Sequence, residues 1–154
     1  MKVDSGTIRI RERFHASPRR IFDAWLDPAT AGRWLFATAS QPMAHVTIDA
    51  RTGGSFRFAD QNGTAIGECT GRYVELVPNR RVVFTLDSPR CAGPTLVTVA
   101  ITPRETGCML ELIHAALSGD EARYFEDRWT GILYGLGVEL DAMPEHSALT
   151  RSSR

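Results

Sequence analysis

The sequence lacks most of the features that mark a specialised class of protein. Cys69, Cys91 and Cys108 are odd in number, widely spaced and without a CxxC pair, which fits neither a disulfide framework nor a zinc site. No apolar run exceeds a few residues, so no membrane-spanning helix is expected. Eighteen basic residues balance eighteen acidic ones, whereas a nucleic-acid-binding protein usually shows a basic excess. We therefore expect neither a membrane span nor a nucleic-acid partner.

Catalytic motifs are also missing. There is no Gly-x-Ser-x-Gly elbow, no phosphate-binding glycine loop and no dinucleotide fingerprint. The histidines, at positions 15, 45, 114 and 146, show no metal-ligand spacing, so we expect no metal and no cofactor. Behind Lys2 there is no apolar segment of the kind found in a signal peptide, which makes a cytoplasmic location the default expectation.

What the chain does contain is the composition of one globular domain. Its 154 residues are 43% hydrophobic and 23% charged, which fits neither a disordered nor a membrane protein. We predict a single domain over residues 1–143, followed by a polar, disordered tail over 144–154.

Apolar and polar residues alternate with period two along much of the chain, which predicts an antiparallel meander. The alternation places strands over 7–15, 44–50, 55–58, 64–77, 81–87, 95–102 and 108–116. Turn residues mark the reversals, at Gly53-Gly54 and at 60–63 for example. The fourth strand is long enough that Gly67 or Gly71 is expected to mark a bulge or bend. Arg9, Arg11 and Arg13 are spaced by two, which predicts a solvated face of the first strand.

Three helices are expected. Ser17-Pro18 is a helix start, and Asp27-Pro28 separates that helix from a short second one that ends near Trp34. The third should run over about 120–142. Its glycines at 131, 135 and 137 weaken it by roughly 1 kcal/mol each relative to alanine. Either a ligand or strand approaches closely there, or the helix packs tightly on the sheet; we favour packing.

This order of elements, β-α-α-β6-α, resembles the helix-grip fold of the START-like or SRPBCC superfamily, an α+β class. The closer resemblance is to the AHSA-type branch, which is related to the ATPase-activating domain of a heat-shock-protein co-chaperone. It is carried by residues 17–25, 34, 49–56, 71–78, 81–85, 107–114 and 129–133. Similar proteins often place glycine just before the helical tryptophan, where this chain has Arg128. We expect Arg128 to pair with Glu126 or Asp127, although an anionic ligand is the alternative.

The fold usually encloses a cavity between the curved sheet and the last helix. The expected lining residues are Trp34, Phe56, Phe58, Tyr73, Phe84, Leu86, Leu110, Leu112, His114, Phe125, Arg128, Trp129, Ile132 and Leu133. On the fourth strand, Tyr73 and Glu75 share one face, whereas Glu68 and Arg72 share the other. The alternation alone does not decide which of these two rows lines the cavity.

Three functions compete. The leading one is non-catalytic binding of a small hydrophobic or amphipathic molecule in the cavity. The second is a cyclase- or hydratase-type enzyme, with His114 and one of Glu68, Glu75 or Asp87 as an acid–base pair. The third, implied by the resemblance, is regulation of a chaperone or another protein interaction. The resemblance also admits a homodimer, which nothing in the sequence demonstrates.

Overall fold

The computed structural model describes residues 6–36, 43, 45–59 and 68–142. In this part of the chain it shows an α+β fold with a seven-stranded antiparallel sheet in the order β1-β7-β6-β5-β4-β3-β2. The strands are β1 (Ile8–Phe14), β2 (His45–Ile48), β3 (Ser55–Ala59), β4 (Cys69–Val77), β5 (Arg81–Leu86), β6 (Thr95–Arg104) and β7 (Gly107–Ala115). The helices are α1 (Pro18–Leu26), α2 (Pro28–Trp34) and α3 (Gly119–Ala142).

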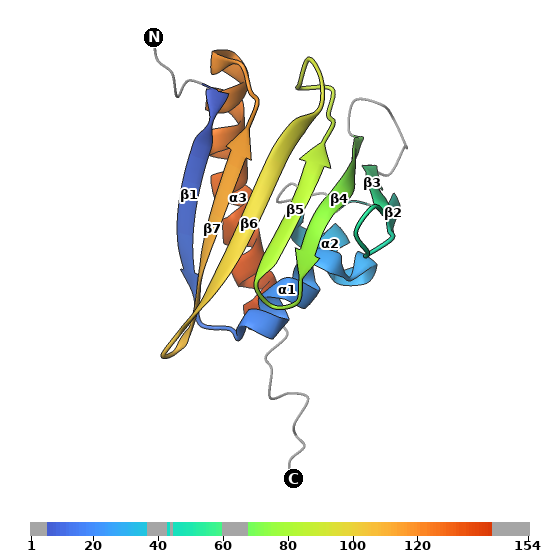
Figure 1. Ribbon diagram of the computed structural model, residues 1–154. Helices are drawn as coiled ribbons and strands as arrows, with labels where there is room; N and C mark the ends of the chain where they lie inside the picture. Colours follow the sequence, from blue (N-terminus) through green and yellow to red (C-terminus); the bar gives the residue numbers. More distant parts are fainter. Residues whose placement is uncertain (1–5, 37–42, 44, 60–67, 143–154) are drawn as a thin grey trace.

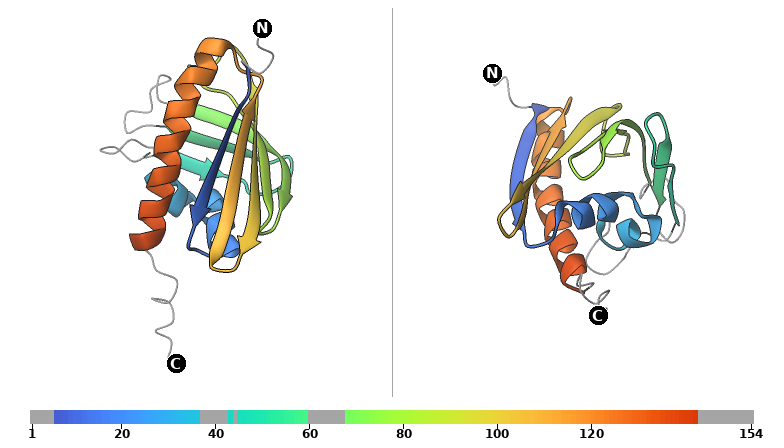
Figure 2. Two further views of the ribbon diagram at one scale, coloured as in Figure 1. Left: turned by 90° about the vertical axis from the view of Figure 1, so that its left-hand side faces the viewer. Right: turned by 60° about the horizontal axis from the view of Figure 1, so that its bottom comes forward.

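The sheet curves around the helices. Helix α3 runs along its inner face, behind β1, β7 and β6 in Figure 1, while α1 and α2 lie across one end. Figure 2 shows the same arrangement from the side and from below, with the long helix held inside the curve of the strands. This is the helix-grip architecture expected from the order of elements. No helix of the described residues has the length and apolarity needed to cross a bilayer.

Helix starts follow the expected capping chemistry. The Ser17 hydroxyl accepts from the Arg20 backbone N–H at 3.2 Å, and Pro18 begins α1. The Asp27 carboxylate then accepts from the Thr30 N–H at 2.9 Å, so one residue ends α1 and caps α2. This shared cap fixes the bend between the two helices.

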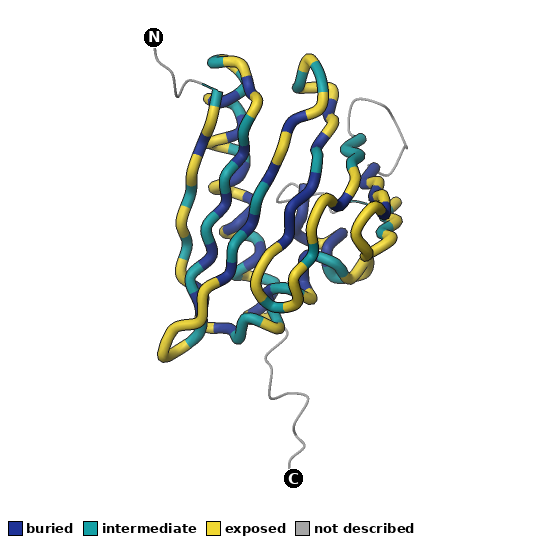
Figure 3. The backbone as a smooth tube through the Cα atoms, in the orientation of Figure 1, coloured by how far each residue is buried: buried dark blue, intermediate teal, exposed yellow. Residues whose placement is uncertain are grey.

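Burial alternates along most of β6 and throughout β7, and Figure 3 shows the burial of the described backbone. In β7 the inward-facing residues Cys108, Leu110, Leu112 and His114 are all buried, and the residues between them are half-buried. The arginines at 9, 11 and 13 are exposed on the opposite face of β1, as their spacing predicts. The period-two pattern therefore identifies the inner face correctly.

The inner row of β4 is the one that contains Tyr73. Tyr73 is 4% exposed, whereas Arg72 is exposed. The register to β5 shifts between Tyr73 and Glu75, and this bulge leaves both Val74 and Glu75 on the exposed side. The bulge therefore lies beyond Gly71, one of the two glycines expected to mark it.

Close packing explains the glycine at position 71. A Cβ atom there would lie 1.9 Å from the Thr85 carbonyl oxygen and 2.6 Å from the Phe56 ring. Gly67 lies outside the described residues, together with the first part of the predicted fourth strand. The turn at 60–63 and the tail at 144–154 also lie outside them. Cys91, in the loop before β6, is half-buried and packs against the core.

The glycines of α3 do not mark tight packing, contrary to the interpretation favoured from the sequence. A Cβ atom at Gly131 would meet nothing within 4 Å. At Gly135 and Gly137 the nearest atoms, on Trp34 and Phe14, lie at an ordinary contact distance of 3.8 Å. The residues around α3 thus leave room for a Cβ atom at all three glycines.

Replacing Gly131 with alanine should therefore stabilise the protein by about 0.5–1 kcal/mol, because alanine restricts the unfolded chain and favours the helix. Urea denaturation of wild type and Gly131→Ala measures the change. The matched control is Gly71→Ala, which should destabilise strongly because the new methyl group would overlap the Thr85 carbonyl. Equal or lower stability of Gly131→Ala would contradict the expectation.

Candidate functional site

A cluster of aromatic rings fills the space between the sheet and the helices. Trp25 of α1 packs edge-on against Trp34 of α2, with ring centroids 4.9 Å apart. Trp25 also lies 6.1 Å from Trp129 of α3 and 6.1 Å from Phe84 of β5. From the sheet, Phe56 lies 5.4 Å from Phe84 in a T-shaped arrangement. The rings thus connect all the elements that could enclose a ligand.

Between these rings a cavity of about 10 Å³ remains. Its described lining consists of Trp25, Leu35, Phe36, Phe56, Tyr73, Val82 and Phe84. That volume corresponds to roughly one water molecule. Deeper in the fold, Leu112 and Trp129 have no exposed surface. In the described part of the chain, side chains therefore fill the expected open cavity; Phe56, Tyr73 and Phe84 were expected to line it, whereas Trp25, Leu35, Phe36 and Val82 were not.

The expected lining residues nevertheless share one location. Except for the half-buried Arg128, all of them are buried in a single core: Trp34, Phe56, Phe58, Tyr73, Phe84, Leu86, Leu110, Leu112, His114, Phe125, Trp129, Ile132 and Leu133. Three of them, Phe56, Tyr73 and Phe84, border the residual cavity. Burial raises the pKa of the Tyr73 hydroxyl, so this phenol stays neutral at physiological pH.

Phe36 packs among the aromatic rings that fill the interior. It was not predicted as a site residue. Its ring is 4% exposed and lies 5.1 Å from Phe58 and 5.8 Å from Trp129. Its backbone has a φ of 62°, a left-handed conformation that costs a bulky residue about 1–3 kcal/mol. Nothing in the sequence signals this, because a phenylalanine after a helix gives no indication of positive φ.

Arg128 holds the backbone of Phe36. Its Nη2 donates to the Phe36 carbonyl oxygen at 2.8 Å. This contact joins α3 to the segment after α2 and differs from the predicted pairing with Glu126 or Asp127. The arginine therefore secures the strained residue that fills the interior.

Trp25 carries a polar atom that the fold leaves unsatisfied. Its indole Nε1 is fully enclosed and has no hydrogen-bond partner, a condition that costs about 1–3 kcal/mol. The other two indoles are satisfied: Trp34 donates to the Ala24 carbonyl at 3.1 Å, and Trp129 donates to His114 Nδ1 at 3.0 Å. Trp25 is thus the exception among the indoles, and it borders the residual cavity.

His114 is fully buried within a hydrogen-bonded chain. Trp129 Nε1–H donates to its Nδ1, and Thr95 Oγ1 lies 2.7 Å from its Nε2. Because the Thr95 hydroxyl donates its only hydrogen to the Leu86 carbonyl, it must accept from Nε2–H. The ring is therefore the neutral Nε2–H tautomer with both nitrogens engaged. Burial lowers the pKa of His114 from 6.5 to about 4.

The candidate carboxylates are not brought to His114. Glu68 pairs with Arg57, and Glu75 accepts from Arg81 at 2.9 Å on the exposed face. Asp87 is exposed, and its backbone pairs with that of Thr70. The carboxylate whose charge acts on the His114 ring is that of Glu121, which accepts from the backbone N–H groups of Ser118 and Ala92. The geometry assembles no acid–base pair from the predicted residues.

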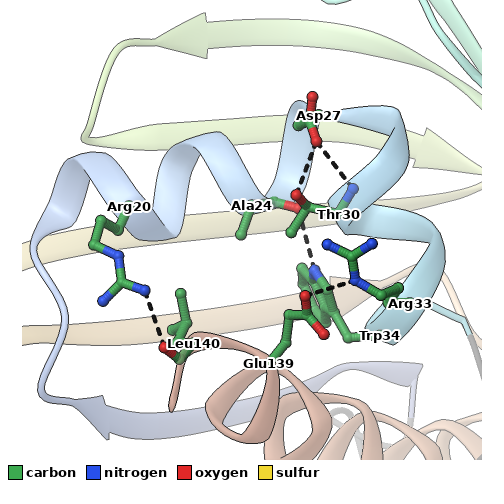
Figure 4. A network of polar contacts seen from close by, with 8 residues as sticks. All are labelled: Arg20, Ala24, Asp27, Thr30, Arg33, Trp34, Glu139 and Leu140. Carbon is green, nitrogen blue, oxygen red and sulfur yellow. Dashed lines mark hydrogen bonds and ion pairs between the residues drawn. The ribbon is translucent and has the colours of Figure 1, made fainter. Parts of the chain in front are cut away.

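A separate groove of about 520 Å³ lies where α1 and α2 meet the end of α3. Figure 4 shows its polar groups tying the helices together. Arg20 donates to the Leu140 carbonyl at 3.0 Å, and Arg33 pairs with Glu139 at 2.7 Å. Arg20 thus engages the backbone of α3 and Arg33 engages the Glu139 side chain, so we assign both arginines to joining the three helices.

The cysteines are poor nucleophiles. Burial raises the pKa of both Cys69 and Cys91 to about 11, so they remain thiols at neutral pH. Cys108 is buried in β7, and burial raises its pKa as well. Within the described residues, no three His, Cys, Asp or Glu side chains are grouped as metal ligands.

Comparison with models of protein families identifies the family of this chain. The model of the family described as Activator of Hsp90 ATPase homolog 1-like protein matches residues 15–141. The chain belongs to this family. No curated protein shows a significant match.

Solved structures share the fold of this AHSA1-like chain. An AHSA1-like protein from Aeromonas hydrophila is 22% identical, with a TM-score of 0.76 over 89% of this chain and 93% of that one. Protein CV1439 from Chromobacterium violaceum is 27% identical, with a TM-score of 0.69 over 86% and 95%. An Hsp90 activator from Plasmodium falciparum is 19% identical, with a TM-score of 0.71 over 88% and 96%.

The neutral, buried His114 of this AHSA1-like protein should make its stability fall in acid. Below pH 6.5 the unfolded state binds a proton that the native ring refuses until about pH 4. Its contribution, fully present above pH 6.5, should decrease by up to about 1.4 kcal/mol per pH unit, roughly 3 kcal/mol in all.

Unfolding free energies from urea titrations between pH 7.5 and 4.5 measure this effect. His114→Gln should be less stable at neutral pH, yet lose less stability on acidification than wild type does. A parallel pH dependence in the two proteins would show that His114 does not carry the effect.

Proposed function

We propose that this protein binds a small hydrophobic or amphipathic molecule between the sheet and α3, in the space that the Phe36 ring occupies here. The observation that carries the proposal is the state of Phe36. One buried ring, on a strained backbone, fills the middle of an aromatic chamber. Strained residues of this kind cluster at active sites and ligand clamps, which supports a functional role for Phe36.

The surroundings of Phe36 support binding. The chamber walls are aromatic and aliphatic with few polar groups, which is the usual composition of a small-molecule pocket. The strained φ of Phe36 would relax when its ring leaves, which offsets part of the packing lost from Phe58 and Trp129. A ligand of similar shape would restore that packing.

The same geometry disfavours an enzyme that uses His114. A general base needs a free lone pair near the reacting proton, and both ring nitrogens of His114 are engaged. The Trp129–His114–Thr95–Leu86 chain instead links α3 to β7, β6 and β5 inside the fold. We therefore assign His114 to support of the chamber wall.

Interior binding is tested by thermal shift with fatty acids, aromatic polyketides and flavonoids, and by native mass spectrometry for a co-purified molecule. At least one class should stabilise the wild-type protein, by about 2.7 kcal/mol at a ligand concentration one hundred times Kd. Phe36→Gly should bind more tightly, because it removes both the ring and the strain.

The matched control is Phe125→Ala, which removes a buried ring beside His114 that does not border the residual cavity. It should lower stability without strengthening ligand binding. If no ligand stabilises either wild type or Phe36→Gly, interior binding is refuted.

A second candidate is regulation of a chaperone ATPase, supported by the family match and by the fold shared with the Plasmodium Hsp90 activator. Measuring ATP hydrolysis by Hsp90 with and without the purified chain tests it. A several-fold increase, saturating with the amount of chain added, would support this activity. An unchanged rate, together with no retention of Hsp90 in a pull-down, would dismiss it.

A further inference from the structure

We propose that the indole N–H of Trp25 is the hydrogen-bond anchor for the ligand, a neutral aromatic molecule of one ring that carries a carbonyl or ether oxygen. This inference rests on the proposed interior binding and specifies its chemistry. Two independent observations meet at Trp25: an enclosed donor without a partner, and a residual cavity that its ring borders. An acceptor oxygen placed there would satisfy the only enclosed side-chain polar atom that the described fold leaves unpaired.

The ligand should be uncharged. No Asp, Glu, Lys, Arg or His belongs to the described lining of the cavity, so an ion placed there would be buried without a partner. Tyr73, the other lining residue with a polar side-chain atom, is a phenol that its burial keeps neutral. A hydrogen-bond acceptor is therefore matched, whereas a carboxylate or ammonium group is not.

The ligand should also be flat and about the size of the ring it displaces. Phe36 presents its ring edge-on to Phe58, and Trp25 is in contact with Phe84 and Trp129, so the vacated space lies between aromatic faces and edges. An apolar cavity of about 150 Å³ is known to stay dry and to bind benzene. One aromatic ring with a small oxygen-bearing group fits such a space.

A single buried water is the simplest competing partner for Trp25. A buried water typically needs two to four hydrogen-bonding partners. Apart from Trp25 and Tyr73, the described side chains around the cavity are Leu35, Phe36, Phe56, Val82 and Phe84, none of which has a polar atom. A water there would have at most two side-chain partners, the lower limit, whereas an acceptor carried on an aromatic body would also replace the packing of the Phe36 ring.

The indole region of a ¹H–¹⁵N spectrum tests the anchor directly, because the chain has only three tryptophans. Trp34 and Trp129 donate hydrogen bonds, so in the free protein the Trp25 indole proton should resonate upfield of theirs. Acetophenone is the probe, and α-methylstyrene, which replaces its C=O by C=CH₂, is the matched control. Acetophenone should move the Trp25 signal further downfield than α-methylstyrene does, whereas the Trp34 and Trp129 signals, whose hydrogen bonds do not change, should respond alike to the two probes.

Affinities give a second readout. In Phe36→Gly, acetophenone should bind about tenfold more tightly than α-methylstyrene, the worth of one hydrogen bond. Adding Trp25→Phe should bring the ratio close to one, whereas adding Trp34→Phe should leave it unchanged. If Phe36→Gly does not fold, the same titration on wild type and Trp25→Phe, followed by NMR at saturating probe, gives the comparison.

The outcomes separate this inference from the proposed function. Equal binding of both probes, or a ratio that Trp25→Phe does not change, overturns the anchor while interior binding stands. Failure of both probes to bind Phe36→Gly and wild type counts against interior binding by small aromatic molecules and overturns the anchor with it. A free-state Trp25 indole proton that resonates with the other two and shows exchange contacts to water also overturns the anchor, since a water would then be its partner.

Discussion

Packing among the aromatic rings is the contact on which the arrangement of sheet and helices depends. Trp25 contacts Trp34, Phe84 and Trp129, and so joins α1 to α2, to β5 and to α3 at one point. Each such pair contributes about 0.5–1.5 kcal/mol beyond the area it buries. Because these rings come from every layer, a change in the position of one helix must be accommodated by the others. The interior that the proposed ligand would enter is therefore also the structural core.

Two polar features are set into this apolar interior, and they differ in kind. The chain from Trp129 through His114 and Thr95 to Leu86 is fully satisfied, so it stabilises one arrangement of α3 against β5, β6 and β7. Trp25 Nε1 has no partner, which leaves a cost in the same core. The satisfied chain links four elements of the fold, whereas the unpaired indole lies beside the residual cavity.

The outer surface of the sheet is arranged differently. On the edge strand β1, Arg9 and Arg11 both pair with Glu111 of β7 at 2.9 and 3.3 Å, and Arg13 donates to Thr106. Antiparallel pairing of β1 with a second copy would set these arginine rows opposite each other, which is unfavourable. A homodimer therefore remains a prediction, and this edge is a poor place for its interface.

Local pattern was sufficient to predict the fold and insufficient to predict the state of its interior. Alternation of period two and the caps at Ser17 and Asp27 depend on neighbours in the chain, so the strands, the helices and the inward row of β7 could be read directly. Three other features depend on distant segments meeting: the bulge after Tyr73, the satisfied state of His114, and the filling of the chamber by Phe36. The residues alone determined which side chains are buried together; whether their packing leaves room for a ligand was decided by the shapes of rings contributed by α1, α2, α3 and the sheet.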